Sequence, residues 1–124
     1  MKKILLTFDL EEFDLPKEFN INLSEDQMYK ISLRGLNKIQ ELLKKHNLTA
    51  TFFTTANFAK KYPKTIKQLS KDNHEIASHG YSHSQQLTLK NLKEAKEAKE
   101  KIINKPIKGF RAPRWDLKNI NHVE

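Results

Sequence analysis

Four carboxylates follow a short hydrophobic run near the start of the sequence. The run ends at Asp9, and Glu11, Glu12 and Asp14 come within the next five positions. Like charges this close repel one another, so the arrangement costs free energy unless a cation offsets it. Basic side chains or a bound metal ion could supply the positive charge. This segment is therefore the first candidate for a functional site.

Two histidines four positions apart are the second group of candidate ligands. His79 and His83 lie in the segment SHGYSH at 78–83. If that segment forms a helical turn, residues i and i+4 lie on one face and both imidazoles can reach one ion. Two neutral imidazoles and one carboxylate make the three-ligand pattern of a catalytic zinc site, which keeps a position open for water. A pair of surface histidines is the alternative, because the spacing alone is a weak signal.

A third segment, GFRAPRW at 109–115, carries two arginines on either side of an Ala-Pro pair. Its glycine and proline indicate a turn. The planar guanidinium of Arg111 or Arg114 could hold a carboxylate in a fixed orientation. A surface arginine beside a turn explains the same pattern equally well, so the segment by itself decides nothing.

The elements that would position these residues alternate between strands and helices. Apolar and β-branched runs predict strands at 3–8, 48–55, 74–78 and 107–111. Helical spacing predicts helices at 24–46, 57–61, 63–71 and 88–104. The first strand is apolar throughout, which is typical of a strand buried on both faces. Ser24 and Gln27 match a capping box, and Thr88 is the expected cap of the last helix.

This β-α-β order predicts an α/β fold with parallel strands and helical crossovers. Parallel α/β sheets carry their chemistry at the carboxyl ends of the strands. The carboxylates follow the first predicted strand, the histidines the third and the arginines the fourth. All three groups are therefore expected at one edge of the sheet, where we predict a metal site.

Composition and charge narrow the class of protein. The 124 residues are 37% hydrophobic, with no run of about 18 apolar residues, which predicts one soluble domain and no membrane span. The initial apolar run is too short for a secretory signal, so we expect a cytoplasmic location. The net charge of +8 comes almost entirely from lysines on predicted helices, which favours solvated surfaces over nucleic-acid binding. An anionic envelope polymer stays an alternative, and the absence of cysteine excludes thiolate ligands.

Taken together, the three segments resemble the motifs of the polysaccharide deacetylases, also called NodB-like carbohydrate esterases. TFDLEE resembles the first motif, TFDD. SHGYSH resembles the second, H-[ST]-x-x-H, with Gly80 in place of Ser or Thr, and RAPRW resembles the third, R-x-P-[FYR]. The resemblance implies the N-terminal portion of a deformed (β/α) barrel, related to the TIM barrel. It also implies a hydrolase of carbon–nitrogen, non-peptide bonds that removes N- or O-acetyl groups from sugars with the aid of a metal.

The resemblance implies roles for individual residues. Asp9 matches the catalytic base, Arg111 the arginine that orients it, and Arg114 the position whose backbone N–H contacts the oxyanion. His79 and His83 match the metal-binding histidines, with zinc as the expected ion.

The third ligand is where the sequence departs from the usual motif, because Leu10 occupies the position of the second aspartate. A branch of the family carries Asp-x-Glu instead, so we assign Glu11 as the ligand and keep Glu12 as the alternative. In an extended strand Asp9 and Glu11 point to the same side and Leu10 to the other. Gly80 lacks a hydroxyl that commonly braces the second motif, which weakens support of the loop but not ligation.

Family domains continue past the third motif to a late histidine that acts as general acid. We therefore expect residues 1–124 to form a single, incomplete domain that self-associates or needs a partner fragment. The expected substrate is an acetylated sugar or cell-envelope polysaccharide, and activity of this chain alone is an open question. Two alternatives remain: a non-catalytic metal- or carbohydrate-binding remnant, and a related amidohydrolase acting on a small nitrogenous compound.

Overall fold

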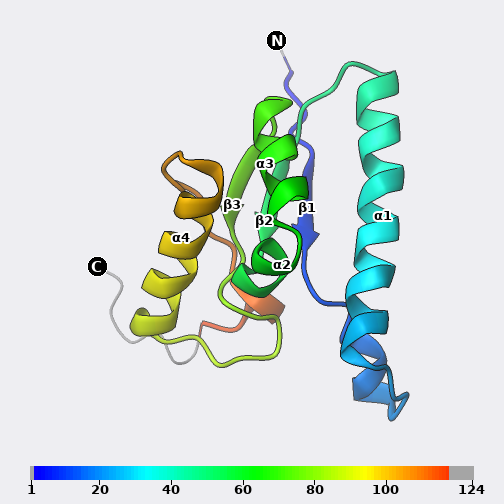
Figure 1. The fold of residues 1–124 in the computed structure, drawn as a ribbon, viewed down its shortest axis with the longest axis vertical. Coiled ribbons are helices and arrows are strands. Elements are labelled where there is room, and N and C mark those ends of the chain that lie inside the picture. The colour runs from blue at the N-terminus through cyan, green and yellow to red at the C-terminus, as the bar shows by residue number, and fades with distance from the viewer. Residues whose placement is uncertain (1, 118–124) are drawn as a thin grey trace.

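The computed structural model describes residues 2–117, which form a parallel sheet with helices on one face (Figure 1). The strands lie in sequence order and all pair in parallel: β1 (Thr7–Leu10), β2 (Thr51–Thr54) and β3 (Glu75–Ser78). The helices are α1 (Glu25–Lys45), α2 (Ala56–Lys61), α3 (Pro63–Lys71) and α4 (Leu89–Ile103). Two 3-10 helices are η1 (Leu15–Phe19) and η2 (Pro113–Trp115). The predicted α/β fold with parallel strands and crossover helices is confirmed.

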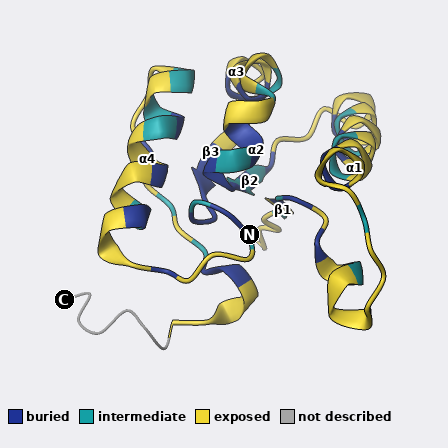
Figure 2. Cartoon of the chain, turned by 60° about the horizontal axis from the view of Figure 1, so that its bottom comes forward, coloured by how far each residue is buried: buried dark blue, intermediate teal, exposed yellow. Residues whose placement is uncertain are grey.

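The core lies between the sheet and the helices because alternate strand residues are apolar. Phe52 in β2 is fully buried and stacks on Phe8 in β1, with ring centroids 5.5 Å apart. Leu10 belongs to the same buried cluster. Figure 2 shows this dark blue interior beneath helices whose outer faces are exposed. Side chains of the other parity, such as Asp9 and its neighbour Phe53, point to the opposite face of the sheet.

Local sequence signals set the helix ends. The Ser24 side chain accepts from the backbone N–H of Gln27 and forms the predicted capping box, and Thr88 forms a second one with Asn91. An asparagine with positive φ lies at or just after the end of α1, α3 and α4: Asn47, Asn73 and Asn104. Asparagine tolerates the left-handed conformation that closes a helix, so these ends need no tertiary contact.

The first strand is shorter and less buried than predicted. β1 begins at Thr7 rather than Lys3, and Ile4 and Leu5 are 88% and 86% exposed. The partner strand explains the difference. Thr7 pairs with Thr51, where β2 begins, and the chain before β2 still turns at Asn47. Thr7 and Asp9 on one face of β1 are exposed, so the prediction of burial on both faces was wrong. The expected self-association stays a prediction.

The predicted fourth strand at 107–111 is not formed as a strand. It is reduced to a parallel bridge between Ser78 and Phe110, in which the Ser78 N–H donates to Gly109 O at 2.8 Å. The Ile107 N–H donates to the Glu100 carboxylate at 2.9 Å instead of to a strand neighbour. The bridge nevertheless holds the start of the arginine segment against the end of β3.

One lysine contradicts the prediction that the lysines cover solvated helix faces. Lys99 on α4 has 0% of its surface exposed, whereas Lys93 on the same helix has a side chain that is 78% exposed. No helix among residues 2–117 combines the length and apolar character needed to cross a membrane.

Candidate functional site

Glu11 and the two histidines converge beyond the carboxyl ends of the strands. Glu11 Oε2 lies 2.8 Å from His79 Nε2, and Glu11 Oε1 lies 3.4 Å from His83 Nε2. One ligand atom from each of the three residues lies within 4.8 Å of the other two. Glu12 is not brought to this point, because its buried carboxylate accepts a hydrogen bond from the Thr55 hydroxyl at 2.8 Å. The structure thus brings Glu11 to the histidines and turns the alternative carboxylate away.

The other nitrogen of each ring is held by an acceptor. His79 Nδ1 lies 2.8 Å from the carbonyl oxygen of Arg111, and His83 Nδ1 lies 2.5 Å from Asp14 Oδ1. A carbonyl can only accept, so His79 Nδ1 carries the proton, and the carboxylate favours the same tautomer for His83. Each Nε2 atom then carries a lone pair directed at Glu11. Ligating histidines commonly have this arrangement, in which the other ring nitrogen donates its proton to a nearby acceptor.

The positions of these three side chains fit a divalent cation. With both imidazoles in this neutral tautomer, Glu11 Oε2 is buried and receives no hydrogen bond. Two Nε2 lone pairs facing a carboxylate repel it, and a buried acceptor without a donor costs free energy. A cation among the three groups would turn the repulsion into coordination. Two imidazoles and one carboxylate are a ligand set that zinc uses.

Asp9 is bound by Arg111 and is not one of the three converging residues. The Arg111 guanidinium donates through Nη1 to Asp9 Oδ1 at 2.7 Å and through Nη2 to the Thr7 hydroxyl at 2.9 Å. Its central carbon lies 4.1 Å above the centre of the Phe53 ring. Three contacts on one planar group hold it rigidly, so Asp9 is held in a fixed orientation. Thr7 and Phe53 were not identified from the sequence, although their side chains lie on the same face of the sheet as Asp9, opposite the core.

Arg114 lies near the cluster but does not contact Asp9 or Glu11. Its side chain pairs with Glu18 and, at 3.4 Å, with Asp14 Oδ2. Its φ of 55° places the backbone in the left-handed region within η2. The oxyanion role predicted for this position belongs to the backbone N–H and stays a prediction.

The loop that carries the histidines is not the helical turn assumed from the sequence. Residues 79–83 are irregular, and Gly80 has a φ of 74°. The rings still stack, with centroids 6.1 Å apart and planes 20° from parallel. Hydrogen bonds to the start of α2 hold the loop: Ala56 N–H donates to Gly80 O at 3.1 Å, and Asn57 N–H to Tyr81 O at 2.9 Å. Hydrogen bonds of the loop backbone, and not a helical turn, therefore bring the two imidazole rings together.

Asp14 is a functional candidate that the sequence reading left without a role. It is buried, with 6% of its surface exposed, and orients His83 as described above. Its N–H donates to Glu12 O, so it lies in a tight turn after β1. A carboxylate three positions after a ligand was visible in the sequence, but nothing local showed which histidine it meets.

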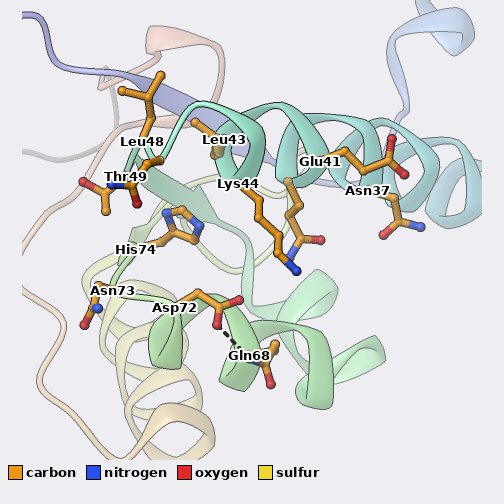
Figure 3. Close-up of a pocket in the computed structure, with 12 residues that line it drawn as sticks. Asn37, Glu41, Leu43, Lys44, Leu48, Thr49, Gln68, Asp72, Asn73 and His74 are labelled. Atoms are coloured by element: carbon orange, nitrogen blue, oxygen red, sulfur yellow. Dashed lines mark hydrogen bonds between the residues drawn. The ribbon is translucent and has the colours of Figure 1, made fainter.

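A larger cavity, of about 780 Å³, lies at the other end of the sheet (Figure 3). Its walls come from α1 and the end of α3, and it contains His74, Asp72 and Lys44. The His74 ring is already used, because its Nδ1 accepts the Ala50 N–H at 3.2 Å. The cavities beside the histidine cluster are smaller, about 240 Å³ next to His83. We place the site where the buried polar groups converge, and not at this larger cavity.

Comparisons with known proteins identify a family whose members are deacetylases. The family model described as polysaccharide deacetylase matches residues 1–120. The chain is 39% identical over 67 residues to the peptidoglycan-N-acetylmuramic acid deacetylase PdaA of Bacillus subtilis. That match covers 54% of this chain and 25% of the relative.

Solved structures share the fold. A Mycobacterium smegmatis protein assigned to the polysaccharide deacetylases superposes with a TM-score of 0.72 at 28% identity, covering 92% of this chain and 44% of that one. A family 4 acetyl xylan esterase of Clostridium thermocellum, solved in complex with a cobalt ion, superposes with a TM-score of 0.63 at 19% identity. That superposition covers 90% of this chain and 49% of the esterase. The chain therefore spans less than half the length of these proteins.

Proposed function

The chain belongs to the polysaccharide deacetylase family, and we propose that its site removes acetyl groups from an acetylated carbohydrate with the aid of a divalent metal ion. The observation that carries the proposal is the convergence of Glu11, His79 and His83, where a buried carboxylate oxygen lacks a hydrogen bond. Because PdaA is named as a peptidoglycan deacetylase, an acetylated cell-envelope polysaccharide is the substrate class that we propose.

The metal would be held by Glu11, His79 and His83, and we propose zinc because the ligand set is two imidazoles and a carboxylate. When bound, such an ion polarises a carbonyl and makes an attacking water easier to deprotonate. The imidazoles bind metal only when neutral, so protons compete with the ion.

Asp9 is the proposed general base. Arg111 binds Oδ1, and in the described part of the chain Oδ2 has no partner and is left to accept a proton from the attacking water. A base held within hydrogen-bond reach contributes about 10²–10⁴ to a rate. The backbone N–H of Arg114 is the proposed donor to the oxyanion that develops on the acetyl carbonyl.

The group that protonates the leaving amine is not identified in the described part. The histidines of residues 2–117 outside the cluster are His46, which follows α1, and His74, which lines the far cavity. His122 lies outside the described residues. This favours, as the second candidate, a domain that binds metal or carbohydrate without turnover.

Zinc content and acetate release separate these candidates. The chain dialysed against trace zinc should retain about one ion, and acetate should be released from N-acetylglucosamine oligomers or peptidoglycan fragments. One ion without acetate release would support the binding role. Release of ammonia from a small amide, with no acetate from sugars, would support the small-molecule amidohydrolase. A chain that retains no zinc would overturn the metal site and the proposed function with it.

A further inference from the structure

Lys99 is a charged side chain that the proposed mechanism does not use, and it is completely buried. It lies on α4, with 0% of its surface exposed. Its polar contact in the described part is one hydrogen bond, from Nζ to the carbonyl oxygen of Gly80, at 3.2 Å. Burial lowers the pKa of Lys99 from its ordinary value to about 7. Burying an ammonium group costs free energy, so a lysine here needs a compensating role.

The acceptor of that hydrogen bond lies inside the histidine loop. Gly80 immediately follows His79 and precedes His83 by three positions, and its φ is 74°. A Cβ atom at this position would lie 3.2 Å from Leu87 Cδ2 and 3.3 Å from Pro113 Cγ. Both the backbone conformation and the neighbours therefore disfavour any side chain. Position 80 has no side chain that could hold the loop, so this part of the loop is held through the Gly80 carbonyl.

Two elements provide that support from different directions. The Gly80 carbonyl accepts the Ala56 N–H at the start of α2 at 3.1 Å, and Lys99 Nζ from α4 is its second donor. The next carbonyl, of Tyr81, accepts the Asn57 N–H. Rotation of the peptide after Gly80, which a glycine permits more easily than other residues, would break the bonds of Ala56 and Lys99 together. It would also redirect the chain that leads to His83.

We propose that Lys99 is a positioning residue for the metal site: its hydrogen bond to Gly80 holds the histidine loop in the conformation that presents both rings to Glu11. Lys99 touches neither histidine and acts through the backbone between them. The inference rests on the proposed function, because it concerns the same metal site. It predicts an effect on metal affinity that is separate from any effect on folding.

The test substitutes Lys99→Met, which keeps the length and apolar stem of the side chain and removes the donor. Zinc affinity, measured by competition with a chromophoric chelator, should fall about 10- to 100-fold, as it does when a residue that supports a metal ligand is lost. The thermal midpoint of the metal-free protein should stay the same or rise, because a buried cation is removed. Lys93→Met on the exposed face of the same helix is the matched control and should change neither quantity. Lys99→Arg retains a donor and should keep more of the affinity than Lys99→Met.

Distinct outcomes would overturn the inference. Equal zinc affinity of folded Lys99→Met and the parent would show that the loop needs no help from Lys99, while the zinc site itself would stand. A fall in metal-free stability that accounts for the whole loss of affinity would reduce Lys99 to a packing residue. If Lys99→Met does not fold, NMR of the parent at a pH below the Lys99 pKa of about 7 decides: one lysine ammonium group should exchange its protons slowly, and rapid exchange by all would refute the contact. A parent that binds no zinc would instead overturn the proposed function.

Discussion

The two ends of the parallel sheet both carry histidine, carboxylate and basic side chains, but they are organised differently. At the amino ends of the strands, the cavity of about 780 Å³ contains His74, Asp72 and Lys44 (Figure 3). At the carboxyl ends, the two cavities that His83 lines are about 240 Å³ and 200 Å³. Volume alone would select the end without the converging ligands.

The origin of the partners distinguishes the two ends. At the amino end the partners are closer in sequence: Asp72 accepts from Gln68, one helical turn earlier, and His74 accepts from Ala50, 24 positions earlier. At the carboxyl end, partners lie 102 positions apart for Arg111 and Asp9, and 69 for His83 and Asp14. Polar groups brought together from distant segments and left with an unpaired buried oxygen are costly for folding. Such an arrangement is expected where a protein binds or reacts, not where it only meets solvent.

The largest effect is expected for variants that remove the metal ligands at the carboxyl ends of the strands. Changing His79 and His83 together to alanine should abolish zinc retention, because only Glu11 would remain of the three ligands. His74→Ala at the amino end should leave zinc content unchanged. Metal analysis after dialysis measures both. Equal zinc in the double variant and the parent would place the ion elsewhere in the chain.

The next largest effect distinguishes the proposed base, Asp9, from the proposed metal ligand, Glu11. In a form of the protein that shows acetate release, Asp9→Asn should keep the metal and lose about 10²–10⁴ in turnover. Glu11→Ala should lose the metal, whereas Glu12→Ala should keep it, because Glu12 pairs with Thr55. Loss of zinc from Glu12→Ala instead would mean that the ligand assignment is shifted by one residue.

A smaller effect concerns the carboxylate that orients His83. Asp14→Ala removes the acceptor of the Nδ1 proton and should weaken zinc affinity about 10- to 100-fold. Asp72→Ala, an acidic residue of the amino end, should leave affinity unchanged. Chelator competition on both variants checks the comparison, and equal affinities would show that Asp14 does not orient the ligand.

The buried Lys99 predicts a pH dependence of stability. Burial lowers its pKa in the folded state to about 7 from the ordinary 10.5, so the unfolded chain binds more protons between these values. The free energy of unfolding should therefore rise with pH across that window, by up to about 1.4 kcal/mol per pH unit. Urea unfolding of the parent and Lys99→Met at several pH values isolates this contribution as their difference. A difference that does not change from pH 7 to 10 would contradict it.

The smallest effect belongs to the amino end. Gln68→Ala removes the exposed hydrogen bond to Asp72 and should change the free energy of unfolding by less than about 0.5 kcal/mol. Chemical unfolding measures the change. A loss of several times this size would show that the amino end is as tightly coupled as the carboxyl end.

Much of the fold was predictable because its signals are local. The capping boxes at Ser24 and Thr88 begin α1 and α4 where the sequence indicated. Pro63 begins α3, and the strand and helix order implied the parallel sheet. Strand lengths were not predictable, because the start of β1 depends on where its partner begins. At the predicted fourth strand, the Ile107 N–H donates to the Glu100 carboxylate of α4 instead of to a neighbouring strand, and this contact was not predictable from the local sequence.

The amino-acid sequence by itself determined which residue types lie at the carboxyl ends of the strands, because strand ends and helix caps follow from short-range patterns. Only the tertiary structure decided how those residues pair. It directed Glu11 rather than Glu12 to the histidines, gave His83 the Asp14 carboxylate, and buried Lys99 against the histidine loop. In the run KEAKEAKEK, helical spacing places Lys99 on the same face as the buried Ala95, but a lysine gives no apolar signal of burial. Its burial is set by the loop packed on α4, and contacts between segments far apart in the chain leave no mark in a short stretch of sequence.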